Sequence, residues 1–123
     1  MARSYPLTKE VEIFDIWGVY VFSFIPSYTS NADSHPQLEL FYVDEGVEEV
    51  YEDGKTYQLN AGQMFLRKPN SLHKDRCLSP HSTCYILAFK GESPHFPKLY
   101  DRVIQLTKNQ ITQFFELGYL IFC

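Results

Sequence analysis

The stretch that decides the fold runs from residue 33 to residue 73 and reads DSHPQLELFYVDEGVEEVYEDGKTYQLNAGQMFLRKPNSLH. Residues 47–51 and 55–59 flank Asp53-Gly54, and an Asp-Gly step between two strand-like runs is the strongest short-range sign of a β-hairpin. Pro69 stops the next run, at residues 64–66, because proline cannot donate to a strand ladder. Short strands separated by turns predict an antiparallel sandwich or barrel and not a parallel sheet.

The run from Leu38 to Val43 predicts which side chains face the interior. Side chains alternate between the two faces of a strand, so Glu39, Phe41 and Val43 share one face and Tyr42 lies on the other. We expect the first three to point into the barrel and Tyr42 to lie outside it. A carboxylate is therefore predicted beside an aromatic ring in the interior.

Strands are also expected on both sides of this stretch. Residues 11–24 are rich in Val, Ile, Phe, Tyr and Trp and are closed by Pro26, which predicts two short strands. Residues 84–89 form another continuous apolar run. Trp17 and most of the Tyr and Phe residues are expected to belong to the core.

A helix is predicted at the end of the chain. Thr107 and Gln110 have the spacing of a capping box, in which each side chain bonds the other residue's backbone amide. The apolar residues that follow share one helical face, which needs a partner such as a second subunit. That predicted contact face comprises Ile111, Phe114, Phe115, Gly118 and Phe122.

The length, composition and charge of the chain exclude several classes of protein. The 123 residues suit one domain, and 45% of them are hydrophobic, which excludes a disordered chain. The net charge of -4 and the lack of a Lys or Arg run argue against direct binding to nucleic acid. With no run of 18 apolar residues and no signal peptide, we expect a cytoplasmic protein that does not enter a membrane. Cys77, Cys84 and Cys123 lack metal or disulfide spacing and are expected to be reduced.

The ordered motifs resemble the sensing domain of AraC-type transcription regulators. His35 stands four residues before Glu39, in a segment similar to that family's His-x-x-x-Glu-Leu-x-Tyr-Val strand. Residues 62–73 are similar to its Gly-Asp-x-x-x-x-Pro-Pro-x-x-x-His segment. Gln63 replaces the usual Asp, and Lys68 the first Pro. The resemblance implies a mainly β fold: a cupin barrel, also called a jelly roll or double-stranded β-helix, with antiparallel strands and a C-terminal α-helix.

The resemblance also implies a domain division and a function. Residues 1–105 would form the barrel and residues 106–123 a helix for dimerisation, leading to a helix-turn-helix DNA-binding domain that this chain lacks. A small-molecule effector, for which a sugar is one candidate, would enter the barrel of a homodimer and control DNA binding through that domain. On this interpretation the chain is not an enzyme, and its pocket is lined by His35, Glu39, Phe41 and His73.

A metal site is an alternative use of the same residues. Enzymes of the cupin class hold a metal with His and Glu side chains, and here Asp33, His35 and Glu39 share parity while His73 comes from the second segment. Two imidazoles with one or two carboxylates suit Zn, Ni, Mn or Fe. The rival hypothesis is therefore a stand-alone metal-dependent cupin enzyme, an isomerase or a dioxygenase. A third is a dimerisation module with a filled interior. His81 and His95 lie in proline-bounded loops and are assigned no role.

Overall fold

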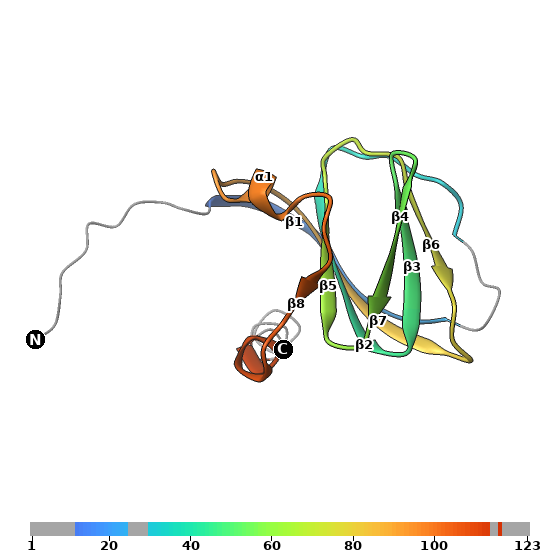
Figure 1. The fold of residues 1–123 in the computed structure, drawn as a ribbon. Coiled ribbons are helices and arrows are strands. Elements are labelled where there is room, and N and C mark those ends of the chain that lie inside the picture. The colour runs from blue at the N-terminus through green and yellow to red at the C-terminus, as the bar shows by residue number, and fades with distance from the viewer. Residues whose placement is uncertain (1–11, 25–29, 114–115, 117–123) are drawn as a thin grey trace, which may run out of the picture.

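The computed structural model describes residues 12–24, 30–113 and 116. Their strands form two antiparallel sheets that face each other, one in the order β1-β7-β2-β5-β8 and one in the order β4-β3-β6 (Figure 1). The elements are β1 Glu12–Phe24, β2 Leu38–Glu45, β3 Val47–Glu52, β4 Lys55–Asn60, β5 Gln63–Arg67, β6 His73–Cys77, β7 Ser82–Glu92, α1 Phe96–Leu99 and β8 Ile104–Gln105. A second helix begins at Lys108. The prediction of a mainly β, antiparallel fold is confirmed.

The predicted hairpin joins β3 to β4. Asp53 and Gly54 have φ values of 47° and 88°, the two positive values that a two-residue I′ turn requires, and Glu52 pairs with Lys55 across the turn. Gly46 is equally constrained, because a side chain there would meet the His81 carbonyl oxygen at 2.3 Å. These turns fix the register of the smaller sheet.

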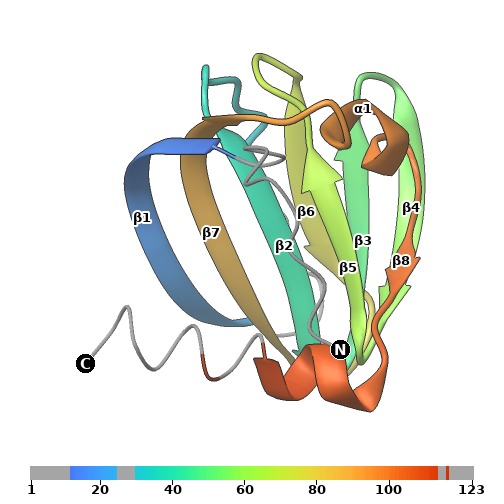
Figure 2. The ribbon, with the colours of Figure 1, turned by 90° about the vertical axis from the view of Figure 1, so that its left-hand side faces the viewer.

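The predicted pair of strands at residues 11–24 is wrong for the described residues, which form the single strand β1. Its pairing with β7 is interrupted between Ile13 and Asp15 and again between Ile16 and Gly18. A bulge adds a residue without ending a strand, so Gly18 marks an irregularity and not a turn. Figure 2 shows β1 as the outer strand of the larger sheet, beside β7.

Three elements were not expected: β6, α1 and β8. Strand β6 reads His73-Lys74-Asp75-Arg76-Cys77, and its residues alternate between buried and exposed, but with polar side chains turned inward. Hydrophobic alternation, the usual sign of a strand, is therefore absent. The short helix α1 follows the proline-bounded loop that contains His95, and His95 is its N-cap residue.

The capping box at the start of the last helix is present. Thr107 N donates to Gln110 Oε1 at 2.9 Å, and Gln110 N donates to Thr107 Oγ1 at 3.2 Å. Ile111, from the predicted dimer face, lies against the barrel, where its Cδ1 is 3.7 Å from the place a Gly62 side chain would occupy. Phe114, Phe115, Gly118 and Phe122 lie outside the described residues. No helix within the described ranges is long and apolar enough to span a membrane.

The core has two parts, one on each face of the larger sheet. Between the sheets lie Phe41, Val43, Val50, Leu59, Phe65, Cys77, Cys84 and Ile86. On the outer face, Leu38, Leu66, Leu87 and Phe89 are packed against Phe96, Leu99 and Tyr100 of the α1 region. Phe41 and Val43 are thus inside, as the parity of the 38–43 run predicts. Tyr42 lies on the opposite face, beside the Tyr85 ring at 6.2 Å.

Candidate functional site

Two distant segments meet at one end of the barrel. Asp33 and His73 exchange backbone hydrogen bonds in both directions, each 2.9 Å long, and Asn70 N donates to His35 O at 2.7 Å. The segment before β2 and the loop between β5 and β6 are thereby joined, and Figure 1 places both at the same end of the barrel. This end is called the mouth, and the Lys108 helix lies toward the other end.

Two acids, the buried Glu52 and the exposed Asp53, hold the loop that carries His73. Glu52 Oε2 accepts hydrogen bonds from Lys68 N and from Ser71 Oγ, both at 3.0 Å, and Asp53 Oδ1 accepts one from Leu72 N at 2.8 Å. Burial raises the pKa of Glu52, and the bonds from Lys68 and Ser71 oppose that rise. These hydrogen bonds join the hairpin turn to the loop between β5 and β6, and together they fix the position of His73.

The two predicted histidines converge on Glu39. His35 Nε2 lies 2.9 Å from Glu39 Oε1, and His73 Nε2 lies 3.6 Å from Glu39 Oε2. Their rings meet edge to face with centroids 4.8 Å apart. Each Nδ1 lies near a backbone carbonyl, that of Gln37 at 3.1 Å for His35 and that of Ser71 at 3.2 Å for His73. The Nε2 atoms are thus the ones turned toward the carboxylate.

Arg67 completes the group, and it was not predicted. Its side chain is 2% exposed, donates from Nη1 to Glu39 Oε2 at 2.8 Å, and forms an ion pair with Asp75. The guanidinium carbon lies 4.7 Å from the centroid of the Phe41 ring, so predicted pocket residue Phe41 forms the floor beneath it. We call the polar residues at this end the mouth cluster: Asp33, His35, Glu39, Arg67, His73 and Asp75.

The electrostatics of the mouth cluster follow from Arg67. Burial alone would raise the pKa of Glu39, but the charge and hydrogen bond of Arg67, with the two histidines, hold it below its ordinary value. Burial and the Arg67 charge lower the pKa of His73. Burial also lowers the pKa of Arg67, opposed chiefly by Glu39. At neutral pH the cluster therefore contains an ionised Glu39 held by a buried cation.

Part of the predicted metal set has suitable geometry. Asp33, His35 and His73 can each offer one ligand atom, and these atoms lie within 4.8 Å of one another. A metal-binding histidine usually donates its second ring N–H to a carbonyl, and both Nδ1 atoms are placed to do so. These three residues therefore fit a divalent transition metal. Glu39, the fourth predicted ligand, is bound to Arg67, and its role as a ligand stays a prediction.

A further buried acid, Glu48, lies toward the other end of the barrel. Glu48 is fully buried beside Ser82, Cys77 and Cys84, and burial raises its pKa, although these three polar neighbours oppose the rise. Burial and the neighbouring Glu48 also raise the pKa of Cys84 far above its usual value. A thiol in that state is a poor nucleophile, in keeping with the expectation that Cys77 and Cys84 are reduced core residues.

Strand parity carries a signal that could have revealed the missed residues. Arg67 shares parity with Phe65, Asp75 with His73, and both Glu48 and Glu52 with Val50. Because alternate residues share a face, the inward direction of one predicts that of the other. Conversely, Trp17 was expected in the core and is 61% exposed. Strand β1 is the outer strand of its sheet, and residues 13–17 are all exposed, so Trp17 shares the exposure of both faces of this part of the strand.

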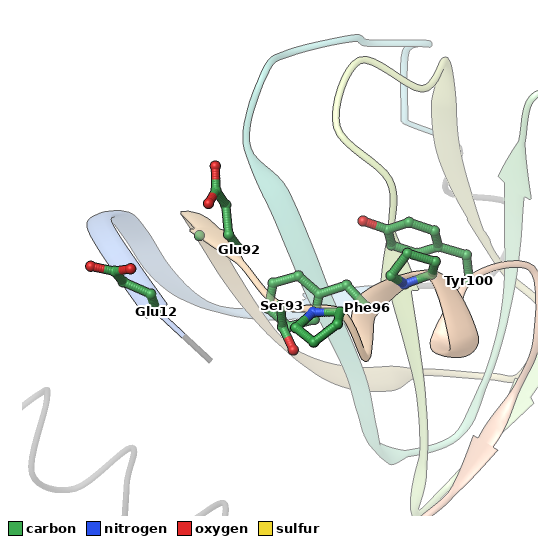
Figure 3. Close-up of a pocket in the computed structure, with 8 residues that line it drawn as sticks. Glu12, Glu92, Ser93, Phe96 and Tyr100 are labelled. Carbon is green, nitrogen blue, oxygen red and sulfur yellow. The ribbon is translucent and has the colours of Figure 1, made fainter. Parts of the chain in front are cut away.

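A separate groove lies outside the barrel, where β1 begins and β7 ends beside α1 (Figure 3). Its volume is about 460 Å³. Glu12 and Glu92 stand on one side of it, and Phe96 and Tyr100 on the other. None of the predicted site residues lines this groove, so it is independent of the mouth cluster.

Comparison with known families matches residues 20–89, more than half of the chain, to the cupin domain. No curated protein sequence matches the chain. Among solved structures, a conserved protein of unknown function from Streptococcus pyogenes aligns with a TM-score of 0.59 and 21% identity over 67% of this chain and 70% of its own.

Two similar structures carry names of enzymes. A predicted oxalate decarboxylase from Thermotoga maritima aligns with a TM-score of 0.57 and 13% identity, over 60% of this chain and 66% of its own. The DMSP lyase DddQ from Ruegeria pomeroyi has a TM-score of 0.54 and 16% identity, over 63% of this chain and 42% of its own. At these identities the likeness establishes the cupin fold and leaves the activity of this chain open.

Proposed function

Because this chain belongs to the cupin domain family, we propose that its barrel is the effector-binding domain of an AraC-type transcription regulator. The sequence resemblance described above supports this finer assignment. On this proposal the mouth cluster binds a polar small molecule, the chain is not an enzyme, and its protein acts in the cytoplasm. A homodimer would form through the C-terminal helix and would bind DNA through a further domain.

The ion pair between Arg67 and Glu39 is the observation that carries the proposal. Glu39 occupies the position that a cupin metal site would use, yet its Oε2 is 2.8 Å from the buried guanidinium. A buried positive charge at this distance competes with a metal ion for the same carboxylate. The pair instead fixes the carboxylate and the neighbouring imidazoles as hydrogen-bonding groups, which is what recognition of a polar ligand requires.

Strand β5 offers a path from the mouth to the helix. Arg67 ends β5 at the mouth, and Gly62, next to the first residue of β5, is close to Ile111 of the C-terminal helix. A ligand that draws on Glu39 would alter the ion pair with Arg67 and thereby favour one position of β5. Regulation follows only if the effector binds the two arrangements with different affinities.

Thermal denaturation with a panel of sugars, polyols and phenols tests the proposal. A ligand that binds only the folded protein raises the melting temperature, by an amount worth about 2.7 kcal/mol at a concentration a hundred times its Kd. The shift should disappear in Glu39→Gln and persist in Glu49→Gln, whose carboxylate pairs with exposed Arg76 outside the barrel. Absence of any shift across the panel would refute effector binding.

The regulatory part has its own experiment. The chain is joined to a DNA-binding module that represses a reporter only as a dimer, and the reporter is followed with and without the ligand found above. We expect ligand-dependent repression that Glu39→Gln abolishes. Ligand binding with an unresponsive reporter would reject the regulator while leaving effector binding in place.

A metal-dependent cupin enzyme is the second candidate, favoured by the group Asp33, His35 and His73. These residues would hold the ion, and a bound divalent metal would act as a Lewis acid on a substrate oxygen. Metal analysis of purified protein distinguishes this candidate: it requires near-stoichiometric metal that is lost in His73→Ala and retained in His81→Ala, a histidine exposed on a loop. Metal-free protein would exclude it.

A further inference from the structure

The only tryptophan in the sequence stands at the mouth of the barrel, exposed. Trp17 has no pairing partner in the β1 register, which passes from Ile16, opposite Phe89, to Gly18, opposite Ala88. Bulges next to functional sites commonly redirect one side chain. Trp17 is 61% exposed, so its indole is accessible to a ligand.

The strand register places Trp17 at the level of the mouth cluster. Gly18, its neighbour, pairs with Ala88, and Ala88 pairs with Glu39 on the next strand. The Trp17 ring lies over the His35 side of the cluster, with centroids 6.4 Å apart and planes inclined by 36°. An exposed indole, an imidazole and an ionised carboxylate thus stand together at the mouth.

The exposed face of the indole indicates a flat ligand. The planes of Trp17 and His35 are inclined by 36°, so the two rings do not form the parallel walls of a slot, and a ligand would lie against one face of the indole. A planar aromatic ring suits such a face, because aromatic rings stack on one another in offset contact.

The charged groups at the mouth indicate which polar groups the ligand carries. Glu39 and Asp33 present carboxylate oxygens, which accept hydrogen bonds and repel anions. Arg67, the cation of the cluster, is buried and already paired with Glu39 and Asp75. Neutral hydroxyl groups, which donate, suit this opening better than a ligand carboxylate does.

We propose that Trp17 is the stacking wall of the effector site and that the effector is a planar aromatic ring carrying neutral hydroxyl groups, a phenol or a catechol. The inference rests on the proposed function and names its ligand class. The ring would lie against Trp17, and its hydroxyls would donate to Glu39 and Asp33.

Catechol is the probe and is titrated into the protein. The buffer contains EDTA, so that binding of catechol to a metal ion does not contribute to the signal. Because Trp17 is the sole tryptophan, its fluorescence, excited away from the tyrosines, reports the site directly. We expect saturable quenching, with the Kd confirmed by calorimetry. Trp17→Ala should weaken the calorimetric affinity about tenfold, as loss of one stacked ring implies, and Trp17→Phe should restore most of it.

Phe14→Ala is the matched control. Phe14 is a similarly exposed aromatic of β1, 56% exposed, and the first bulge leaves it without a pairing partner in the β7 register. Its removal should leave catechol affinity unchanged. Equal affinity in wild type and Trp17→Ala, or no binding of catechol, would overturn the inference. Binding of glucose or benzoate but not catechol would overturn it while leaving effector binding standing, whereas a failure of every ligand would reject both.

Discussion

Two glutamates of the barrel interior, one at the mouth and one toward the other end, have pKa values that are shifted in opposite directions. Glu39, at the mouth, is ionised because Arg67 donates to it, and its pKa is lowered. Glu48, toward the other end, lies among Ser82 and two cysteine thiols, and burial raises its pKa. Burial acts on both in the same direction, so the buried cation decides the difference. The glutamate beside the buried cation belongs to the candidate site, and the other belongs to the core.

Removing the buried cation, Arg67, should change the free energy of unfolding more than either glutamate substitution does. Arg67→Met keeps a long apolar side chain but leaves Glu39 and Asp75 without their buried partner. Loss of one member of a buried ion pair lowers stability by about 3–5 kcal/mol. Urea unfolding at pH 7 measures the free energy of unfolding.

The matched control for this change is Arg76→Met, which removes an exposed arginine paired with Glu49. Its effect should remain within about 0.5 kcal/mol, as for most surface pairs. If the Arg67 and Arg76 variants lost equal stability, the buried pair would not be what holds the mouth together.

Neutralising the mouth carboxylate should have a smaller effect that depends on pH. A lowered pKa means that ionised Glu39 stabilises the fold above its ordinary value of 4.5, and that this contribution is lost as pH falls through the lowered value. Glu39→Gln should therefore destabilise the protein by about 2 kcal/mol at pH 7, the strength of a hydrogen bond to a charged group.

The pH profile supplies the check on Glu39. Chemical denaturation from pH 7 downward should bring wild type and Glu39→Gln together at low pH. A difference that stays constant down to pH 3 would show that the ionised carboxylate is not the stabilising species.

Glu48→Gln should have the smallest effect, with the opposite sign. Because the pKa of Glu48 is raised in the folded protein, the wild type loses stability as pH rises from the ordinary value of 4.5 toward the raised value. Glutamine has no charge to bury, so the variant should be more stable at pH 8, by on the order of 1 kcal/mol, and equal to wild type near pH 4. Thermal denaturation at both values measures this, and destabilisation at pH 8 would contradict the assignment.

The sequence predicts the parts of the site that depend on local order. His35 and Glu39 are four residues apart, and strand parity turns Glu39 inward with Phe41, as the structure confirms. The Asp53-Gly54 turn was equally predictable, because its backbone conformation is specific to those residue types. These features need no knowledge of which strands are neighbours.

The rest of the site depends on contacts between distant segments. Arg67 meets Glu39 only through the β2–β5 register, and Asp33 meets His73 only through a bridge that spans the mouth. Strand β6 was also missed, because two of its inward residues, His73 and Asp75, are polar, and the sequence therefore lacks the alternation of apolar and polar residues that marks a strand. Trp17 was expected in the core and is exposed, because β1 is the outer strand of its sheet and residues 13–17 are exposed on both of its faces; which strand lies at the edge is set by pairing with distant segments.

An anomalous-difference map of crystals grown from protein purified without chelators distinguishes a Glu39 that binds Arg67 from one that binds a metal. We expect that the Arg67–Glu39 contact is kept and that no metal-strength peak lies between Asp33, His35 and His73. A peak bonded by those residues, with Glu39 released from Arg67 and joined to the metal, would contradict it.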